Sequence, residues 1–188
     1  FKNSVGYFNR IISSKGYTFN GTQYSTFSEV TLVNNRGKSD WVAGLNLVTD
    51  QFKETAPTTA PLRNYDQITT GAFIQNTLNA FEWLVLETGG RGDFVKDYGF
   101  ALLPRISALF KIAPRLTTRL GGGFGYKAPT IFTEESEKLL YKNVLPVETK
   151  MNKLERSYGA NLDITYRTSF DKISFSINQV FFYTYLKE

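Results

Sequence analysis

The chain has 188 residues, enough for one domain, and it contains neither cysteine nor histidine. Their absence excludes disulfides, thiolate and imidazole catalysis and the common zinc sites. The net charge of +5 is small and the Lys and Arg residues are scattered, so the composition does not indicate nucleic-acid binding.

Alternation of apolar and polar residues predicts about nine β-strands. The expected strands are Val5–Ile12, Tyr24–Val33, Asp40–Lys53, Gln67–Asn79, Trp83–Gly92, Ala101–Lys111, Leu116–Lys127, Leu154–Arg167 and Lys172–Leu186. Strands of roughly ten residues fit a membrane-crossing barrel better than the shorter strands of soluble sheets. A helical pattern is expected only at Glu134–Tyr141, within a loop.

The alternation is clearest in Leu116–Lys127, where one face is apolar and the other carries glycine, threonine and charge. In a soluble sandwich the apolar face points into a core, whereas in an outer-membrane barrel it points at lipid. The glycines of the polar face would leave room for something packed inside. Aromatic residues, 15% of the chain, widen the apolar face and favour the barrel.

The predicted connections alternate between short and long. The short ones are Asn34–Ser39, Ala80–Glu82, Ile112–Arg115 and Thr168–Asp171. The long ones are Ser13–Gln23, Glu54–Asp66, Asp93–Phe100 and Ala128–Lys153. Every other connection of an up-and-down sheet lies at the same rim, so the pattern predicts short turns at one rim and long loops at the other, as in outer-membrane barrels.

Several motifs follow one another along the second half of the chain. Arg119, a glycine-rich stretch and Gly125-Tyr126-Lys127-Ala128-Pro129 resemble the Arg and Gly-Phe-Arg-Ala-Pro pattern near the end of the barrel in TonB-dependent outer-membrane receptors. Further segments match in the expected order: Gly71–Gln75, Leu84–Asp93, Pro104–Phe110, Lys153–Ser157 and Lys172–Tyr185. Nothing in the chain resembles the plug domain or the TonB-contacting box of the family.

The resemblance implies an all-β fold, an antiparallel up-and-down transmembrane β-barrel or part of one. Residues 1–188 would form a barrel segment of about eight or nine strands without a plug, where family barrels have about 22. It implies a place in the bacterial outer membrane, within the lipid bilayer, and TonB-dependent uptake of a scarce nutrient such as a ferric siderophore or cobalamin. TonB would be contacted through an N-terminal region outside this chain. Neither enzymatic activity nor a bound cofactor is expected.

The ligand of such a receptor would bind at the extracellular mouth, at the rim with the long loops. Cationic and aromatic residues there suit an anionic metal chelate, held by charge and ring stacking. The predicted ligand-binding residues are Arg63, Tyr65, Lys96, Tyr98, Lys127, Tyr141 and Lys142. The acidic group Glu134, Glu135 and Glu137 is interpreted as a solvated loop face, with a cation site as the alternative.

A second hypothesis keeps the chain as a self-contained small barrel of about eight strands. Such a barrel would be a compact monomer that binds an apolar ligand or has a structural role. In a soluble, lipocalin-like form its apolar face would point inward.

Overall fold

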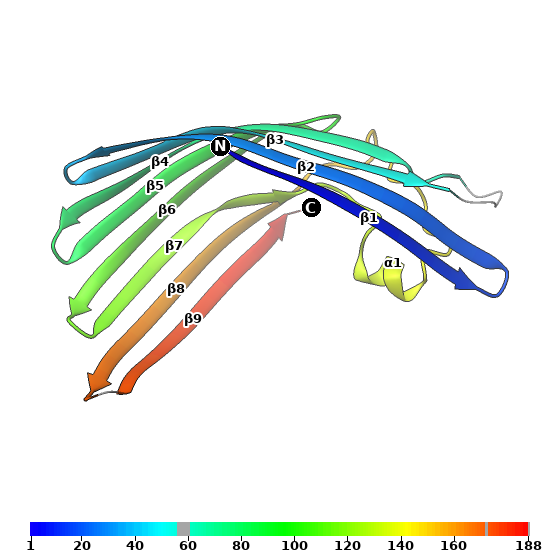
Figure 1. Ribbon diagram of the computed structural model, residues 1–188. Helices are drawn as coiled ribbons and strands as arrows, with labels where there is room; N and C mark the ends of the chain where they lie inside the picture. Colours follow the sequence, from blue (N-terminus) through cyan, green and yellow to red (C-terminus); the bar gives the residue numbers. More distant parts are fainter. Residues whose placement is uncertain (56–60, 172, 188) are drawn as a thin grey trace.

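A computed structural model describes residues 1–55, 61–171 and 173–187. Its nine strands pair antiparallel in chain order, so the described residues form one up-and-down sheet (Figure 1). The strands are β1 (Lys2–Ser14), β2 (Tyr17–Arg36), β3 (Ser39–Glu54), β4 (Tyr65–Phe81), β5 (Leu84–Val95), β6 (Gly99–Ala113), β7 (Leu116–Lys127), β8 (Glu155–Phe170) and β9 (Ile173–Lys187). The predicted all-β, up-and-down fold is confirmed. The predicted first residue of the last strand, Lys172, lies outside the described residues.

The two faces of the sheet differ sharply in polarity. Because cross-strand partners share a face, the register of β3 and β4 puts Leu45, Leu47 and Ile74 on one side and Asn46 and Gln75 on the other. Leu45 and Ile74 are 65% and 51% exposed. Figure 1 shows that the sheet is curved and that the 128–154 loop lies inside the curve. The apolar face is therefore the convex one, and the polar face is concave.

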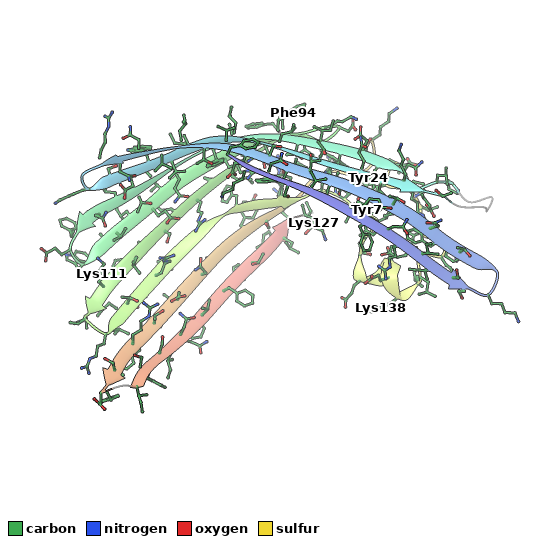
Figure 2. All side chains as sticks on the ribbon, in the orientation of Figure 1. Tyr7, Tyr24, Phe94, Lys111, Lys127 and Lys138 are labelled. Carbon is green, nitrogen blue, oxygen red and sulfur yellow. The ribbon has the colours of Figure 1, made fainter. Side chains whose placement is uncertain are left out.

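Aromatic side chains contribute strongly to the convex face. Tyr7 and Tyr24 are cross-strand partners whose ring centroids lie 5.1 Å apart, and both are at least half exposed. Phe94 projects from the same face farther along the sheet (Figure 2). The described residues form a single sheet and provide no second layer to cover the exposed rings and aliphatic side chains on its outside.

The sheet is open at both edges. Within the described residues, β1 and β9 each pair with one neighbour only, and no pairing joins them. A closed barrel of eight or nine strands requires that pairing, so the small closed barrel is not the fold of the described residues. None of these residues forms a helix long and apolar enough to cross a membrane.

The short connections lie at one end of the sheet, here called the turn rim, as predicted. They join β2 to β3, β4 to β5, β6 to β7 and β8 to β9 (Figure 1). The opposite end, here called the loop rim, carries the connection after β3 and the 128–154 loop, and both were predicted to be long. Residues 56–60 of the first of these lie outside the described residues.

The predicted long loop Ser13–Gln23 is wrong. The strands β1 and β2 remain paired up to Ser14 and Tyr17, and only two residues connect them. Gly16, with φ of 73°, allows this tight turn. The strands extend beyond the apolar band of the convex face. There the apolar side chains change face, with Phe19 and Ile12 packed on the concave side and Asn20 on the convex side, although the backbone ladder continues.

The predicted loop Asp93–Phe100 is also wrong. The strand β5 continues to Val95, and β6 begins at Gly99, which leaves a three-residue turn. Asp97 and Gly99 have φ of 68° and 88°, which close this turn. The side chain of Val95 is fully buried, so packing stabilises this part of the strand, although the sequence shows no alternation there.

The hydrophobic core is small and lies at the loop rim. The residues Phe19, Phe52, Ile131 and Tyr141 are buried together, and the rings of Phe19 and Tyr141 stack with centroids 4.4 Å apart. Two of these side chains come from strands and two from the 128–154 loop. The core therefore fixes this loop on the concave face.

Candidate functional site

The 128–154 loop contains the only helix of the described residues, α1 (Glu134–Lys138). The hydroxyl of Thr133 caps it by accepting a hydrogen bond from the backbone N–H of Ser136 at 3.2 Å. Leu140 and Tyr141 then adopt φ of 51° and 59°, which ends the helix. The helical pattern expected at Glu134–Tyr141 is confirmed but covers fewer residues than predicted.

A buried ion pair between Arg63 and Glu54 supports the loop. The side chains are 6% and 2% exposed. The Arg63 Nε donates to a carboxylate oxygen of Glu54 at 2.8 Å, and the backbone N–H of Arg63 donates to the same oxygen at 3.1 Å. The guanidinium also donates to the Tyr141 carbonyl and, at 3.1 Å, to the Tyr17 hydroxyl. Arg63 thus connects β2 and β3 to the 128–154 loop.

The environment of Glu54 favours its charged form. Burial alone would raise the pKa of this carboxyl, but the hydrogen bonds from Arg63 outweigh burial and hold the pKa below its ordinary value. A lowered folded pKa means that ionisation of Glu54 stabilises the fold above its ordinary pKa of 4.5. That stabilisation is lost as the pH falls through the lowered value.

We therefore expect the 128–154 loop to loosen in acid. The chain has no cysteine, so a nitroxide on Lys138→Cys reports on α1 alone, and its mobility should rise as the pH falls through the lowered pKa of Glu54. The exposed pair of Arg10 with Glu137 also joins α1 to the sheet, so Glu54→Gln serves as the reference. An identical pH profile in the Glu54→Gln variant would show that another carboxyl controls the loop.

A second set of contacts holds the loop at its exposed side. The guanidinium of Arg10 in β1 pairs with Glu137 of α1 and lies over the Tyr141 ring, 5.7 Å from its centroid. Lys142 lies 3.3 Å from the Ser14 hydroxyl, and its ammonium is 5.6 Å from the centroid of the Tyr17 ring. Together with the buried pair of Arg63 and Glu54, these contacts form a row of polar interactions along the loop rim.

Beside the buried core, the loop rim contains a cleft of about 570 Å³. It lies between the ends of β2, β3 and β4, the turn before β6 and the beginning of the 128–154 loop. Its lining includes Tyr65, Lys96, Tyr98 and Lys127, together with Asp50 and Phe132. Four of the seven predicted ligand-binding residues thus surround one space.

The polar groups at the strand side of the cleft satisfy one another. Gln23 donates to both carboxylate oxygens of Asp50, at 2.7 and 2.9 Å, and the hydroxyl of Tyr65 donates to Asp50 at 3.1 Å. Burial and the adjacent carboxylate raise the pKa of Tyr65, so its phenol stays neutral. Tyr65 and Phe132 meet edge to face, with ring centroids 6.3 Å apart. The cleft therefore offers aromatic surface and hydrogen-bonding groups already held in place.

The lysines of the cleft are less available to bind an anionic ligand than the sequence suggests. Lys96 pairs with Asp66 at 2.9 Å, and the hydrogen bond from Lys96 lowers the pKa of that carboxyl. Lys127 forms no ion pair with any residue that the structure describes. The lining holds the carboxylates of Asp50, Asp66 and Asp97 against these two lysines, so this part of the rim has no excess of positive charge.

Three predicted ligand-binding residues lie outside the cleft. Arg63 and Tyr141 are buried in the adjoining cluster, and Lys142 lies against Tyr17; their predicted contact with ligand stays a prediction. Sequence reasoning missed Asp50 and Gln23. Asp50 lies on the polar face of its predicted strand, so the alternation of side chains along that strand could have identified it. Gln23 could not be identified in this way, because it was placed in a predicted loop that the structure does not contain.

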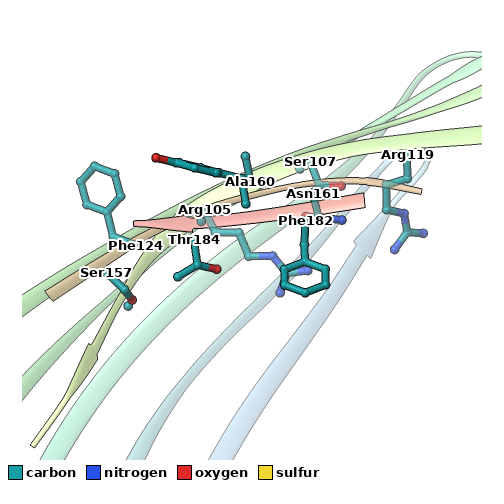
Figure 3. A pocket seen from close by; sticks show the side chains of 15 residues that line it. Arg105, Ser107, Arg119, Phe124, Ser157, Ala160, Asn161, Phe182 and Thr184 are labelled. Atoms are coloured by element: carbon teal, nitrogen blue, oxygen red, sulfur yellow. The ribbon is translucent and has the colours of Figure 1, made fainter. Parts of the chain in front are cut away.

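The concave face has a second hollow of about 470 Å³ over β6 to β9 (Figure 3). Its lining includes Arg105 and Arg119. A Cβ on Gly121 would lie 2.9 Å from the side-chain oxygen of Asn161, and one on Gly125 would lie 2.7 Å from the Ser157 hydroxyl. The glycines of β7 therefore give room first to side chains of β8, its partner strand.

The described residues contain no group of three or more acidic side chains placed to hold a metal ion. Glu137, one of the three acidic residues of α1, pairs with Arg10. Glu134 and Glu135 are exposed, as the solvated-face interpretation expects.

An open antiparallel meander with an apolar convex face and a polar concave face has the architecture of part of the wall of a transmembrane β-barrel. No family model matches the chain, and no curated protein matches it significantly. Similar solved structures do exist, and they are receptors.

The siderophore receptor PirA of Pseudomonas aeruginosa matches 89% of the chain with a TM-score of 0.64 and 17% identity, over 32% of its own length. A mutant of the ferric enterobactin receptor PfeA of the same organism matches 91% with a TM-score of 0.66 and 17% identity, over 27% of its length. PirA of Acinetobacter baumannii matches 90% with a TM-score of 0.63 and 17% identity, again over 27%.

The chain therefore has the fold of part of a siderophore-receptor barrel, as the resemblance in its sequence implied. It spans about a third or less of the length of these receptors.

Proposed function

We propose that the chain is a wall segment of a bacterial outer-membrane receptor that takes up a scarce nutrient, such as a ferric siderophore or cobalamin. The convex face would contact lipid and the concave face the lumen. TonB would supply energy through a region outside this chain. The observation that carries the proposal is the sorting of exposed apolar side chains to the convex face, in a fold shared with siderophore receptors. Those neighbours are receptors, and we propose no enzymatic activity.

The cleft at the loop rim is the proposed ligand site. Tyr65 and Tyr98 would supply ring surface, and Lys127 an ammonium that forms no ion pair with a described residue. Lys96 would contribute through its ammonium at the edge of the cleft. Arg63, Tyr141 and Lys142 would act by holding the 128–154 loop against the cleft.

The charge balance of the cleft limits what this segment can contribute. Its carboxylates offset its lysines, so most of the affinity for an anionic chelate would come from ring stacking, hydrogen bonds and Lys127. The remaining two thirds of the receptor mouth would supply any further positive charge. Ferric enterobactin is the first probe to use, because it is the ligand named for one structural neighbour.

Substituting Lys127 tests the site. In the full-length receptor, Lys127→Gln should weaken binding of ferric enterobactin or another ferric siderophore by about tenfold, the effect of losing one charge-assisted hydrogen bond. The measurement is a fluorescence or radiolabel binding titration. Lys111→Gln is the matched control, because Lys111 is an exposed lysine near the turn rim (Figure 2). If the wild-type receptor binds a ferric siderophore and Lys127→Gln binds it equally tightly, Lys127 does not contact the ligand.

A further inference from the structure

The strands β6 and β7 separate toward the loop rim. Their pairing ends at Arg105 with Gly123, although β6 extends to Gly99 and β7 to Lys127. On their other sides both strands stay paired, with β5 and with β8, up to these ends. The sheet therefore contains a seam, defined as the space between residues 99–104 and residues 124–127.

Pro104 explains where the seam begins. Its carbonyl oxygen lies 3.1 Å from the position that a Cβ of Gly123 would occupy, so the backbone of Pro104 faces β7. In a strand the N–H and C=O of one residue point to the same side, and proline has no N–H. The ladder therefore lacks a donor toward β7 immediately beyond its last pair.

The seam forms an apolar groove of about 420 Å³. Phe100, Leu102 and Pro104 line one side, and Phe124 and Tyr158, which meet edge to face at 4.8 Å, line the other. By register these residues belong to the convex face. By register Tyr126, the partner of Arg156, also belongs to the convex face, and its hydroxyl donates across the seam to the buried carboxylate of Asp93 in β5, at 3.0 Å. The aromatic and aliphatic walls of the groove therefore lie on the convex face, away from the cleft.

Two cations stand at the loop-rim end of the groove. Arg156 lines it, and the cross-strand partner of Arg156 is Lys187, so both side chains belong to the convex face. Both are exposed, and neither forms an ion pair with a described residue. Glu155, the neighbour of Arg156, belongs to the opposite face. Like charges placed opposite one another in a sheet are unfavourable, so this pair favours an anion from outside the described chain.

We propose that the seam binds a phosphate-bearing lipid, with an acyl chain in the groove and the headgroup phosphate on Arg156 and Lys187. An acyl chain matches the aromatic and aliphatic walls, and a guanidinium binds phosphate through two parallel hydrogen bonds. The order of the parts, apolar within the sheet and cationic at its rim, is that of a lipid at a membrane interface. This inference rests on the proposed function, because it requires the convex face to contact lipid.

Lipid titration of the full-length protein tests the seam. Native mass spectrometry in detergent micelles compares phosphatidylglycerol with diacylglycerol, which has the same chains without phosphate. Wild type should prefer phosphatidylglycerol, and Arg156→Gln should weaken this binding about tenfold while leaving diacylglycerol unchanged. Leu102→Trp, at a side chain 65% exposed in the groove, should abolish binding of both by filling it. Arg115→Gln, an exposed arginine at the turn rim, is the matched control.

The outcomes separate this inference from the proposed function. Insertion of the protein into phosphatidylcholine vesicles is measured first by flotation. A protein that does not insert would overturn both. An inserted protein whose phosphatidylglycerol binding is unchanged by Arg156→Gln and Leu102→Trp would overturn the lipid site alone. Equal binding of diacylglycerol and phosphatidylglycerol by wild type would overturn the phosphate contact.

Discussion

Replacing Arg63 by methionine is expected to release the 128–154 loop from the concave face. The substitution leaves Glu54, 2% exposed, as a buried carboxylate without its partner, and it removes the donor to the Tyr141 carbonyl. Breaking a buried pair on one side costs about 3 to 5 kcal/mol. Backbone amides of residues 128–154 should then exchange with deuterium about 100-fold faster or more, while those of the paired strands keep their protection. Hydrogen exchange with mass spectrometry at pH 7 measures this.

Arg10→Met is the matched control for this experiment. Arg10 also reaches the loop, through Glu137, but its side chain is 36% exposed and that of Glu137 is 50% exposed. An exposed ion pair contributes at most about 1 kcal/mol, so Arg10→Met should accelerate exchange by less than about tenfold. Equal acceleration by the two variants would mean that burial of the Arg63 pair does not matter.

A double variant shows why the Arg63 substitution acts. Combining Glu54→Leu with Arg63→Met removes both charges, and exchanging a buried ion pair for apolar side chains is often close to neutral. Part of the protection of the loop should then return. Protection that stays as low as in Arg63→Met would assign the effect to the lost hydrogen bond with Tyr141 rather than to the unpaired carboxylate.

The middle of each strand was predictable because its two faces have different surroundings. Ile74 and Gln75 are neighbours in sequence and lie on opposite faces, so alternation indicates both the strand and its orientation. Near the loop rim this signal fails. Around Gly16 the strands continue, but the apolar side chains Tyr17 and Phe19 lie on the concave face, and the surrounding polar residues and glycines resemble a loop. The fold was thus accessible where the convex face is apolar, and the strand ends were not.

The candidate site was accessible only in part. Tyr65, Lys96, Tyr98 and Lys127 could be grouped because each follows or precedes a connection at the same rim. The burial of Arg63 was not accessible, because the Tyr141 carbonyl that it contacts lies 78 residues away. Pro104 could have been recognised within its strand, since proline interrupts a ladder, but the sequence does not show which neighbour would lose its pairing.

Placing arginine on each face in turn tests the orientation of the sheet in a membrane. Ile74→Arg puts a charge on the convex face, and Gln75→Arg puts the same charge one residue later on the concave face. If the convex face contacts lipid, Ile74→Arg should destabilise the full-length protein by about 2 to 4 kcal/mol near the midplane of the bilayer. Gln75→Arg should cost much less, because water fills the lumen. Equilibrium unfolding by guanidinium in phosphatidylcholine vesicles measures both.

This pair of variants distinguishes a membrane wall from a soluble sheet. In water, arginine at the half-exposed position of Ile74 would be nearly neutral, because its charge would stay hydrated. The more enclosed position of Gln75 would then be the more sensitive one. The expected order is therefore opposite for the two environments, although the charge and the strand are the same. A larger loss of stability for Gln75→Arg would place the convex face in water, and both the receptor function and the lipid site at the seam would then be wrong.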